Sequence, residues 1–319
     1  MSHSVLIVMD PIESIKTQKD TTFGLMLEAQ QRGWELHYCQ PQDLFLEEGK
    51  VHAAHQRVSV EDNPDDWFQF LDTKQLLTDC GQFSAILMRK DPPFDMNYIY
   101  STYLLELAQQ QGALVVNDPA SLRDCNEKLF TAWFPEYTPK TLVSANASRL
   151  KAFAQQYQDI ILKPLDGMGG ASIFRARQGD PNLSVIIETL TDHGKNLAMA
   201  QQFIPEITAG DKRILVVNGE VIPYTLARIP QQGETRGNLA AGGSGVPMLI
   251  TEDEKQIAEA IAPELLKRGL LFVGLDVIGH YVTEINVTSP TCMRELENEY
   301  HINIAGKLFS ALEQQLGNI

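Results

Sequence analysis

Short apolar runs alternate with amphipathic stretches along the first third of the chain. The run at 5–9 is followed by an amphipathic stretch over about 21–32, which stops at Gly33, a residue type that commonly ends a helix. The same order returns with apolar strands at 35–39, 85–88 and 114–116 and with a helix at about 97–111. Alternating strands and helices are typical of a parallel α/β sheet.

Polar and apolar positions alternate over 44–60 around Glu48-Gly49, which predicts an inserted hairpin. The pattern changes near residue 123, where we place the first domain boundary. The next predicted elements are helices at about 128–134 and 148–157, a strand at 159–163 and strands within 214–227. A small α+β unit is expected up to about residue 199.

The last predicted helix begins with the capping box of Thr251 and Glu254 and ends at Gly269. Two strands follow, at 271–278 and 281–287, with a turn at Gly279-His280. Before this helix, the segment 231–245 is rich in glycine and poor in apolar side chains, so we expect a mobile loop there.

Composition describes a globular protein with an acidic surface. The 319 residues are 44% hydrophobic and 21% charged, and the formal net charge is −15. An average surface of this sign repels polyanions, so no nucleic-acid partner is expected. No apolar stretch approaches the roughly 20 residues that span a bilayer, and the first ten residues resemble a strand rather than a targeting segment. We therefore expect no membrane partner and a cytoplasmic location.

The four cysteines are Cys39, Cys80, Cys125 and Cys292, and they show no metal-site spacing. We interpret them as reduced thiols. A nucleophilic role for Cys292, which lies in a polar segment, is the less favoured alternative because no partner histidine is evident.

Three oxygen ligands fall close together near the C-terminal hairpin. Glu284 and Asn286 are two residues apart in a strand, so they share a face, and Asp276 lies on the preceding strand. Two carboxylates and an amide suit Mg²⁺ held jointly with substrate phosphates, although a solvated polar edge would show the same short pattern. Asp276 faces Glu284 only if Ile278 opposes Val282, so we predict a three-residue turn at 279–281.

A glycine-rich loop at 166–171 follows the strand that carries Lys163. Glycines let backbone N–H groups approach phosphate oxygens, although a simple tight turn would have the same composition. The loop has neither Walker A nor dinucleotide-fold spacing. Cations that could face an anion in this acidic chain are Lys128, Lys163, Lys212, Arg213, Arg228 and Arg236, and Arg89 follows a predicted parallel strand.

Six segments resemble the signature segments of the bacterial glutathione synthetases, which belong to the ATP-grasp superfamily. They are MDP at 9–11, MRKDPPFD at 88–95, RDCNEKL at 123–129, LKPLDGMGG at 162–170, GETRGNLAAGG at 233–243 and TEINVTSPT at 283–291. The likeness runs essentially from end to end. It implies an N-terminal parallel α/β substrate-binding domain (1–123), a small ATP-grasp lid (124–200) and a C-terminal antiparallel-sheet domain (201–319) that carries the metal site and the mobile loop 231–245.

The resemblance also implies an activity: ATP-dependent ligation of γ-glutamylcysteine to glycine through an acyl phosphate, giving glutathione, ADP and phosphate. ATP would be the co-substrate, Mg²⁺ the metal ion with Mn²⁺ as an alternative, and a homotetramer the assembly. The rivals are another ATP-grasp ligase with a different acid and amine, and a nucleotide-binding protein without catalysis.

Roles for individual residues follow from the same resemblance. ATP contacts would come from Lys128, Lys163, Asp166, Gly167, Gly169, Gly170, the hinge Gln201, Gln202, Phe203 and Ile204, and Asp211. Catalytic roles would fall to Arg213, Arg228 and Arg236, and metal binding to Asp276, Glu284 and Asn286. The substrate-binding residues would be Arg89, Asp91, Asn238, Ser289 and Thr291.

Overall fold

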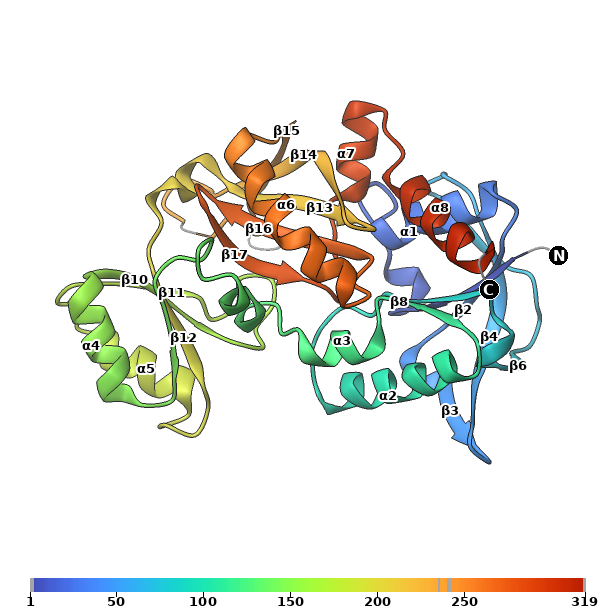
Figure 1. Cartoon of the computed structure of the whole chain (residues 1–319), viewed down its shortest axis with the longest axis horizontal. Coiled ribbons are helices and arrows are strands. Elements are labelled where there is room, and N and C mark those ends of the chain that lie inside the picture. Colours follow the sequence, from blue (N-terminus) through green and yellow to red (C-terminus); the bar gives the residue numbers. More distant parts are fainter. Residues whose placement is uncertain (1–2, 235, 240–241, 318–319) are drawn as a thin grey trace.

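The computed structural model describes residues 3–234, 236–239 and 242–317, and these residues build three β-sheets (Figure 1). A sheet of eight strands and a sheet of four strands lie at opposite ends of the molecule in this view, and a sheet of five strands lies between them. No helix in these three ranges combines the length and the apolar character that crossing a membrane requires.

The eight-stranded sheet has a parallel centre, as the sequence predicted. Strands β1 (Ser4–Val8), β2 (Glu35–Cys39), β7 (Ala85–Met88) and β8 (Leu114–Val116) pair in parallel, in the order β2-β1-β7-β8. The predicted hairpin is confirmed: its long strand β4 pairs antiparallel with β2 and with three short strands. The long strand is β4 (Lys50–Val60), and the three short ones are β3 (Leu44–Glu47), β5 (Phe68–Phe70) and β6 (Leu76–Asp79).

Helices cover both faces of this sheet. On one face α1 packs with α7 and α8, and on the other α2 packs with α3 (Figure 1). Their bounds are α1 (Thr21–Gln31), α2 (Met96–Gln110), α3 (Pro119–Asp124), α7 (Met293–Tyr300) and α8 (Ile304–Gly317). The C-terminal helix therefore returns to the N-terminal sheet, where Trp34 donates to Glu313 at 3.1 Å.

The four-stranded sheet is antiparallel, in the order β11-β10-β12-β9, and α4 and α5 cover one face. Its elements are β9 (Thr141–Ser144), α4 (Ala147–Tyr157), β10 (Asp159–Pro164), β11 (Phe174–Arg177), α5 (Leu183–Thr191) and β12 (Ala198–Gln202). In β10, Ile160 and Leu162 are fully buried against these helices. Because strand residues alternate, Ile161 and Lys163 point to the opposite face.

The five-stranded sheet is antiparallel, in the order β15-β14-β13-β16-β17, and α6 packs against it. Its elements are β13 (Asp211–Val217), β14 (Glu220–Ile229), β15 (Ser244–Leu249), α6 (Glu252–Lys267), β16 (Phe272–Ile278) and β17 (Tyr281–Asn286). The predicted capping box of Thr251 and Glu254 is present. Asn117, just after β8, ties this sheet to the first one through hydrogen bonds of 2.7–2.9 Å with Phe272 and Val287.

Two sequence predictions need correction here. The helix expected at 128–134 is a short 3₁₀ helix, Leu129–Trp133. The helix α3 was missed, although Asp118 at its N-cap and Pro119 in its first turn are ordinary start signals. The other 3₁₀ turns are Ile12–Ser14, Pro41–Asp43, Cys80–Gln82 and Pro205–Ala209.

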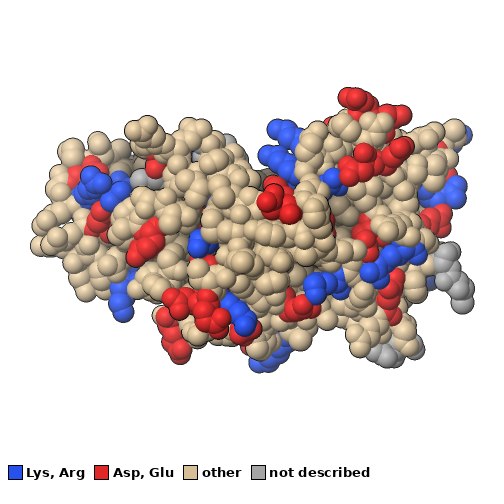
Figure 2. All heavy atoms as spheres, turned by 90° about the horizontal axis from the view of Figure 1, so that it is seen from above, with Lys and Arg blue, Asp and Glu red and all other residues tan. Residues whose placement is uncertain are grey.

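Acidic and basic side chains are interspersed among uncharged areas on the face shown in Figure 2. Most of the cations singled out from the sequence contribute little to the surface, because Lys128, Lys163, Arg213 and Arg228 are each at most 6% exposed. Their charges therefore act inside the molecule.

Candidate active site

A cleft of about 650 Å³, its open mouth included, lies between the uncovered face of the four-stranded sheet and the five-stranded sheet. Ile161, Lys163 and Gln201 line it from the first sheet, and Asp211 and Glu284 from the second. Predicted lysine and carboxylate groups therefore meet in one cavity.

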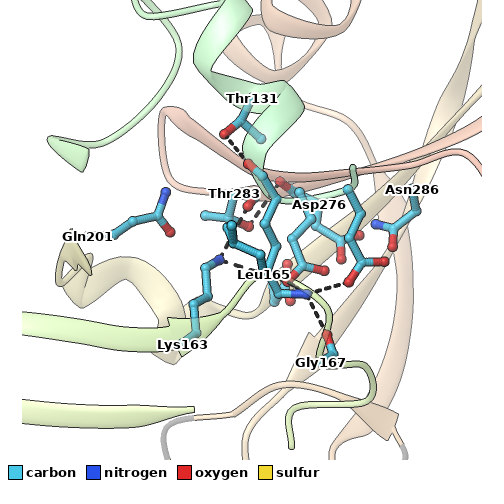
Figure 3. A network of polar contacts seen from close by, with 12 residues as sticks. Thr131, Lys163, Leu165, Gly167, Gln201, Asp276, Thr283 and Asn286 are labelled. Carbon is cyan, nitrogen blue, oxygen red and sulfur yellow. Dashed lines mark hydrogen bonds and ion pairs between the residues drawn. The ribbon is translucent and has the colours of Figure 1, made fainter. Parts of the chain in front are cut away.

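Two lysines converge on Glu284. The Nζ atoms of Lys128 and Lys163 lie 3.5 and 3.8 Å from Oε1 of Glu284. Lys128 also forms an ion pair with Glu127 and donates to the carbonyl of Gly167 at 2.5 Å. The glycine-rich loop therefore contacts the same lysine that lies beside Glu284 (Figure 3). Lys163 donates to the carbonyl of Thr283 at 3.4 Å.

Burial and neighbouring charges act in opposite directions on these lysines. Burial lowers the pKa of Lys128, but Glu284 and Glu127 outweigh it and leave that pKa raised. For Lys163 burial prevails over the attraction of Glu284, so its pKa is lowered. Burial and the charge of Glu284 together raise the pKa of Glu127. An anionic ligand next to Lys163 would favour its charged form.

The hairpin that carries the metal-ligand candidates has the expected alignment but a different turn. Asp276 lies opposite Glu284, as predicted. The predicted three-residue turn is wrong, because Ile278 pairs with Tyr281 and the turn has two residues. The register shift comes instead from Thr283, an extra residue on β17, whose bulge restores the common face of the carboxylates.

Two arginines hold Asp276 on that face. Nε of Arg213 donates to Oδ1 of Asp276 at 2.5 Å, and Nη2 of Arg228 lies 2.8 Å from Oδ2. The Arg228 group also lies 2.7 Å from Oδ2 of Asp211. Burial would raise the pKa of Asp276, but Arg213 and Arg228 hold it far below its usual range. For Asp211, burial outweighs Arg228 and raises the pKa.

The donor set fits a magnesium ion that shares its coordination with phosphates. Glu284, Asp276 and Asn286 share one strand face, and Asn286 lies opposite Gly274. Within the described residues no three His, Cys, Asp or Glu side chains form a complete metal cage. Mg²⁺ commonly uses one or two protein carboxylates and takes the rest of its ligands from phosphates and water, so two carboxylates and an amide suffice.

The two glycine-rich segments touch each other over the cleft. Nη1 of Arg236 donates to the carbonyl of Gly170 at 3.2 Å, and a Cβ at Gly170 would lie 2.7 Å from Oδ1 of Asn238. Gly169 and Gly170 have φ of +62° and +82°, which glycine adopts at little cost, whereas Asp166 is exposed. Of the predicted loop 231–245, residues 235, 240 and 241 lie outside the described part, and its last two residues begin β15.

The predicted adenine hinge consists of the last two residues of β12 and the two residues after it. Gln201, Gln202, Phe203 and Ile204 all line the cavity, and Gln201 donates to Thr141 at 3.1 Å. Oδ1 of Asp211 points into buried space without a hydrogen-bond partner among the described residues. A buried acceptor of this kind suits a ligand hydroxyl.

Hydrogen bonds connect some of the predicted substrate-binding residues to one another and to the arginines. Arg89 is 6% exposed and donates to Thr22 at 3.1 Å and to the carbonyl of Pro290 at 2.9 Å. Ser289 donates to the carbonyl of Arg89 at 3.4 Å, and Thr291 accepts from Arg213 at 3.5 Å. Burial lowers the pKa of Arg89. Asp91 is exposed and its N–H donates to Asp10, while its charge opposes the effect of burial on the pKa of Arg89.

Several candidates named from the sequence change place or rank in the folded chain. Lys212 leaves the cluster, because it pairs with Glu254 on the opposite face of the sheet. Cys292 is buried and burial raises the pKa of its thiol, which supports a structural role. Two residues were missed: Glu127, adjacent to Lys128, and Gly274, where a Cβ would lie 2.7 Å from Arg213.

Comparisons with known proteins bear on this geometry. The N-terminal domain model of prokaryotic glutathione synthetase matches residues 4–123, and the ATP-grasp domain model of the same family matches residues 127–301. The chain belongs to the prokaryotic glutathione synthetase family. The predicted family is thereby confirmed, together with the class of ATP-dependent ligase.

Curated members of the family are similar over nearly their whole length. Glutathione synthetases of Vibrio cholerae and Vibrio vulnificus are 62% and 61% identical over 310 residues, which are 97% of this chain and 97% of each relative. The Escherichia coli glutathione synthetase is 58% identical and covered to 98%.

Solved structures confirm the ATP-grasp fold. D-cycloserine synthetase DcsG superposes with a TM-score of 0.67 at 14% identity, covering 98% of this chain and 99% of that one. The ATP-grasp ligase PsnB, complexed with minimal precursor, Mg and ADP, has a TM-score of 0.61 at 17% identity, with 98% of both chains covered.

Proposed function

We propose that this chain ligates γ-glutamylcysteine to glycine and converts ATP to ADP and phosphate. The observation that carries this function is a single sheet face that bears Arg213, Arg228, Asp276 and Glu284, with Glu284 lining the cleft, in a member of the glutathione synthetase family. A carboxylate does not condense with an amine in water because its oxygen is a poor leaving group. The γ-phosphoryl group of ATP therefore activates the cysteinyl carboxylate as an acyl phosphate.

The residues divide the work by position. Lys128 and Lys163 bind the phosphates of ATP with the backbone of the loop at 166–170, and the hinge 201–204 receives the base, with Asp211 on the ribose. Arg213 and Arg228 stabilise negative charge on the phosphoryl group during transfer, and then on the tetrahedral intermediate that the glycine amine forms. Arg236 and Asn238 close over the loop and exclude water.

Asp276, Glu284 and Asn286 would hold Mg²⁺, which when bound neutralises phosphate charge; Mn²⁺ would be accepted by the same oxygen ligands. Arg89 with Ser289 and Thr291 would bind the dipeptide, with Asp91 at the outer edge. The division into domains at residues 123 and 200 stays a proposal. A homotetramer and a cytoplasmic location stay predictions.

ADP release with γ-glutamylcysteine and glycine varied independently tests this function. If the chain has this function, ADP release requires the dipeptide, and the peptide product appears only when glycine is also present. Equal release with unrelated acids would indicate a different ATP-grasp ligase. Binding of ATP without release under any combination would favour a non-catalytic nucleotide-binding protein.

A further inference from the structure

Arg175 and Phe203 form a stacked pair at the edge of the cleft. The Cζ atom of Arg175 lies 3.4 Å from the centre of the Phe203 ring, well inside the range of a cation–π contact. Arg175 belongs to β11, and Phe203 directly follows β12. These two strands do not pair with each other, since both pair with β10, so the stacked pair connects the outer strand to the hinge.

Asp159 of β10 completes the arrangement. Nε and Nη2 of Arg175 donate to its two carboxylate oxygens at 2.8 and 2.6 Å, and the N–H of Phe203 donates to its carbonyl at 3.0 Å. A two-pronged bond between guanidinium and carboxylate fixes the plane of the guanidinium. The three residues therefore form a closed ring of contacts, in which Asp159 orients Arg175 and Arg175 orients the ring of Phe203.

This ring of contacts lies on the cleft side of the sheet. Arg175 is opposite Ile161, and Ile161 is opposite Gln201, so the three side chains share a face. Ile161, Gln201 and Phe203 all line the cleft. Lys163 is four residues along β10 from Asp159, about 13 Å at strand spacing, so the contacts are remote from the phosphate-binding end.

We propose that Arg175 is a positioning residue for the adenine end of the nucleotide site. It holds the ring of Phe203, and with it the hinge backbone, where the base is received. The inference rests on the proposed function, because it requires ATP to bind in this cleft. It predicts an effect on nucleotide affinity and little effect on the chemical step.

The test compares Arg175→Met with Arg177→Met. Arg177 is on the same strand and face, its Nε lies 3.8 Å from the same Asp159 carboxylate, and its side chain is 70% exposed. We expect Arg175→Met to raise Kd and KM for ATP about 5- to 20-fold, as loss of one such contact does, with kcat within about twofold. Arg177→Met should change none of these values.

Asp159→Asn provides a second variant, since it weakens the hold on Arg175 while leaving that residue in place. It should raise Kd for ATP in the same way, and the double variant should add little, because both changes act through one chain of contacts. The measurement is equilibrium binding of ATP to the full chain, with thermal unfolding alongside.

The outcomes separate the two proposals. A lower Tm with unchanged Kd and KM for ATP in Arg175→Met would make the pair a structural clamp and overturn the positioning role. Unchanged Kd in Asp159→Asn would do the same if Arg175→Met failed to fold. If the unmodified chain bound no ATP, the proposed function itself would fail.

Discussion

Asp276 lies directly opposite Glu284 across the β16–β17 hairpin, although that hairpin turns in two residues. The extra residue Thr283 makes this possible, because its bulge shifts the register by one between Val282 and Glu284. The hydroxyl of Thr283 donates to the carbonyl of Asp276 at 3.2 Å and secures the bulge. The position of both carboxylates on one face therefore depends on a single inserted residue.

Replacing Glu284 with Gln should remove a metal-ligand charge while keeping the side-chain shape. We expect kcat to fall about 10²- to 10³-fold, and the Mg²⁺ concentration for half-maximal rate to rise. The control is Glu220→Gln, because Glu220 is in the same sheet but pairs with Lys307 at the surface. An unaltered Mg²⁺ requirement in Glu284→Gln would remove this residue from the metal site.

Lys163→Met and Lys128→Met should each weaken ATP binding about tenfold or more, because a charge-assisted hydrogen bond to phosphate is lost from a buried position. Calorimetric titration with ATP measures the change. Lys195→Met is the control, since that ammonium is 73% exposed and pairs with Asp192. Equal affinities in all three variants would place the two buried lysines outside the nucleotide site.

Shortening the segment 231–243 should reduce ligation while ATP hydrolysis persists or increases, because water then reaches the acyl phosphate. The cut stops before Ser244, where β15 begins, so that pairing with β14 is kept. Product formation and phosphate release are measured together. Loss of both activities with a much lower Tm would show that the segment supports the fold instead.

His55 should make stability depend on pH. It is 1% exposed, its Nδ1 lies 3.1 Å from Nδ1 of His37, and its Nε2 lies 2.8 Å from Thr78. Burial first, and then His37, lower the pKa of His55 to about 4 from 6.5. Facing Nδ1 atoms have room for one proton between them, so double protonation is disfavoured.

Between these two pH values the unfolded chain binds a proton that folded His55 does not, so the free energy of unfolding should fall as pH decreases from about 6.5 toward 4. The contribution is on the order of 1–3 kcal/mol. In urea unfolding measured at several pH values over this range, the free energy of unfolding of His55→Gln should depend less steeply on pH. His280→Gln, at a ring 71% exposed, should keep the original slope. Identical slopes for both variants would contradict the assignment.

Elements with a local signal could be predicted from the sequence, and elements defined by partners could not. The helix expected at 21–32 is Thr21–Gln31, because its apolar spacing and Gly33 are local features. Strands β5 and β6 have three and four residues and were missed. They exist because β4 is long enough to pair with both, which only the folded arrangement reveals.

The same distinction holds for the candidate site. Asp276, Glu284 and the lysines could be named from residue type and spacing. In the structure Lys163 and Glu284 line the cleft, Lys128 lies beside Glu284, and Asp276 lies opposite it. The sharing of Arg228 between Asp211 and Asp276 depends on cross-strand pairing of β13 with β14 and β16, which spacing along the chain does not define. An extra residue in the turn and an extra residue at Thr283 would both bring Asp276 opposite Glu284. The sequence pattern therefore does not distinguish the two positions.

Asn117 connects two of the three sheets and leaves the four-stranded sheet outside that connection. Hydrogen bonds of its side-chain amide with Phe272 and Val287 fasten the eight-stranded sheet to the five-stranded one. If the dipeptide binds at Arg89 as proposed, these bonds would keep its distance from Asp276 and Glu284 independent of the four-stranded sheet. A nucleotide site that opened by movement of the four-stranded sheet would then leave the proposed alignment of the acid unchanged.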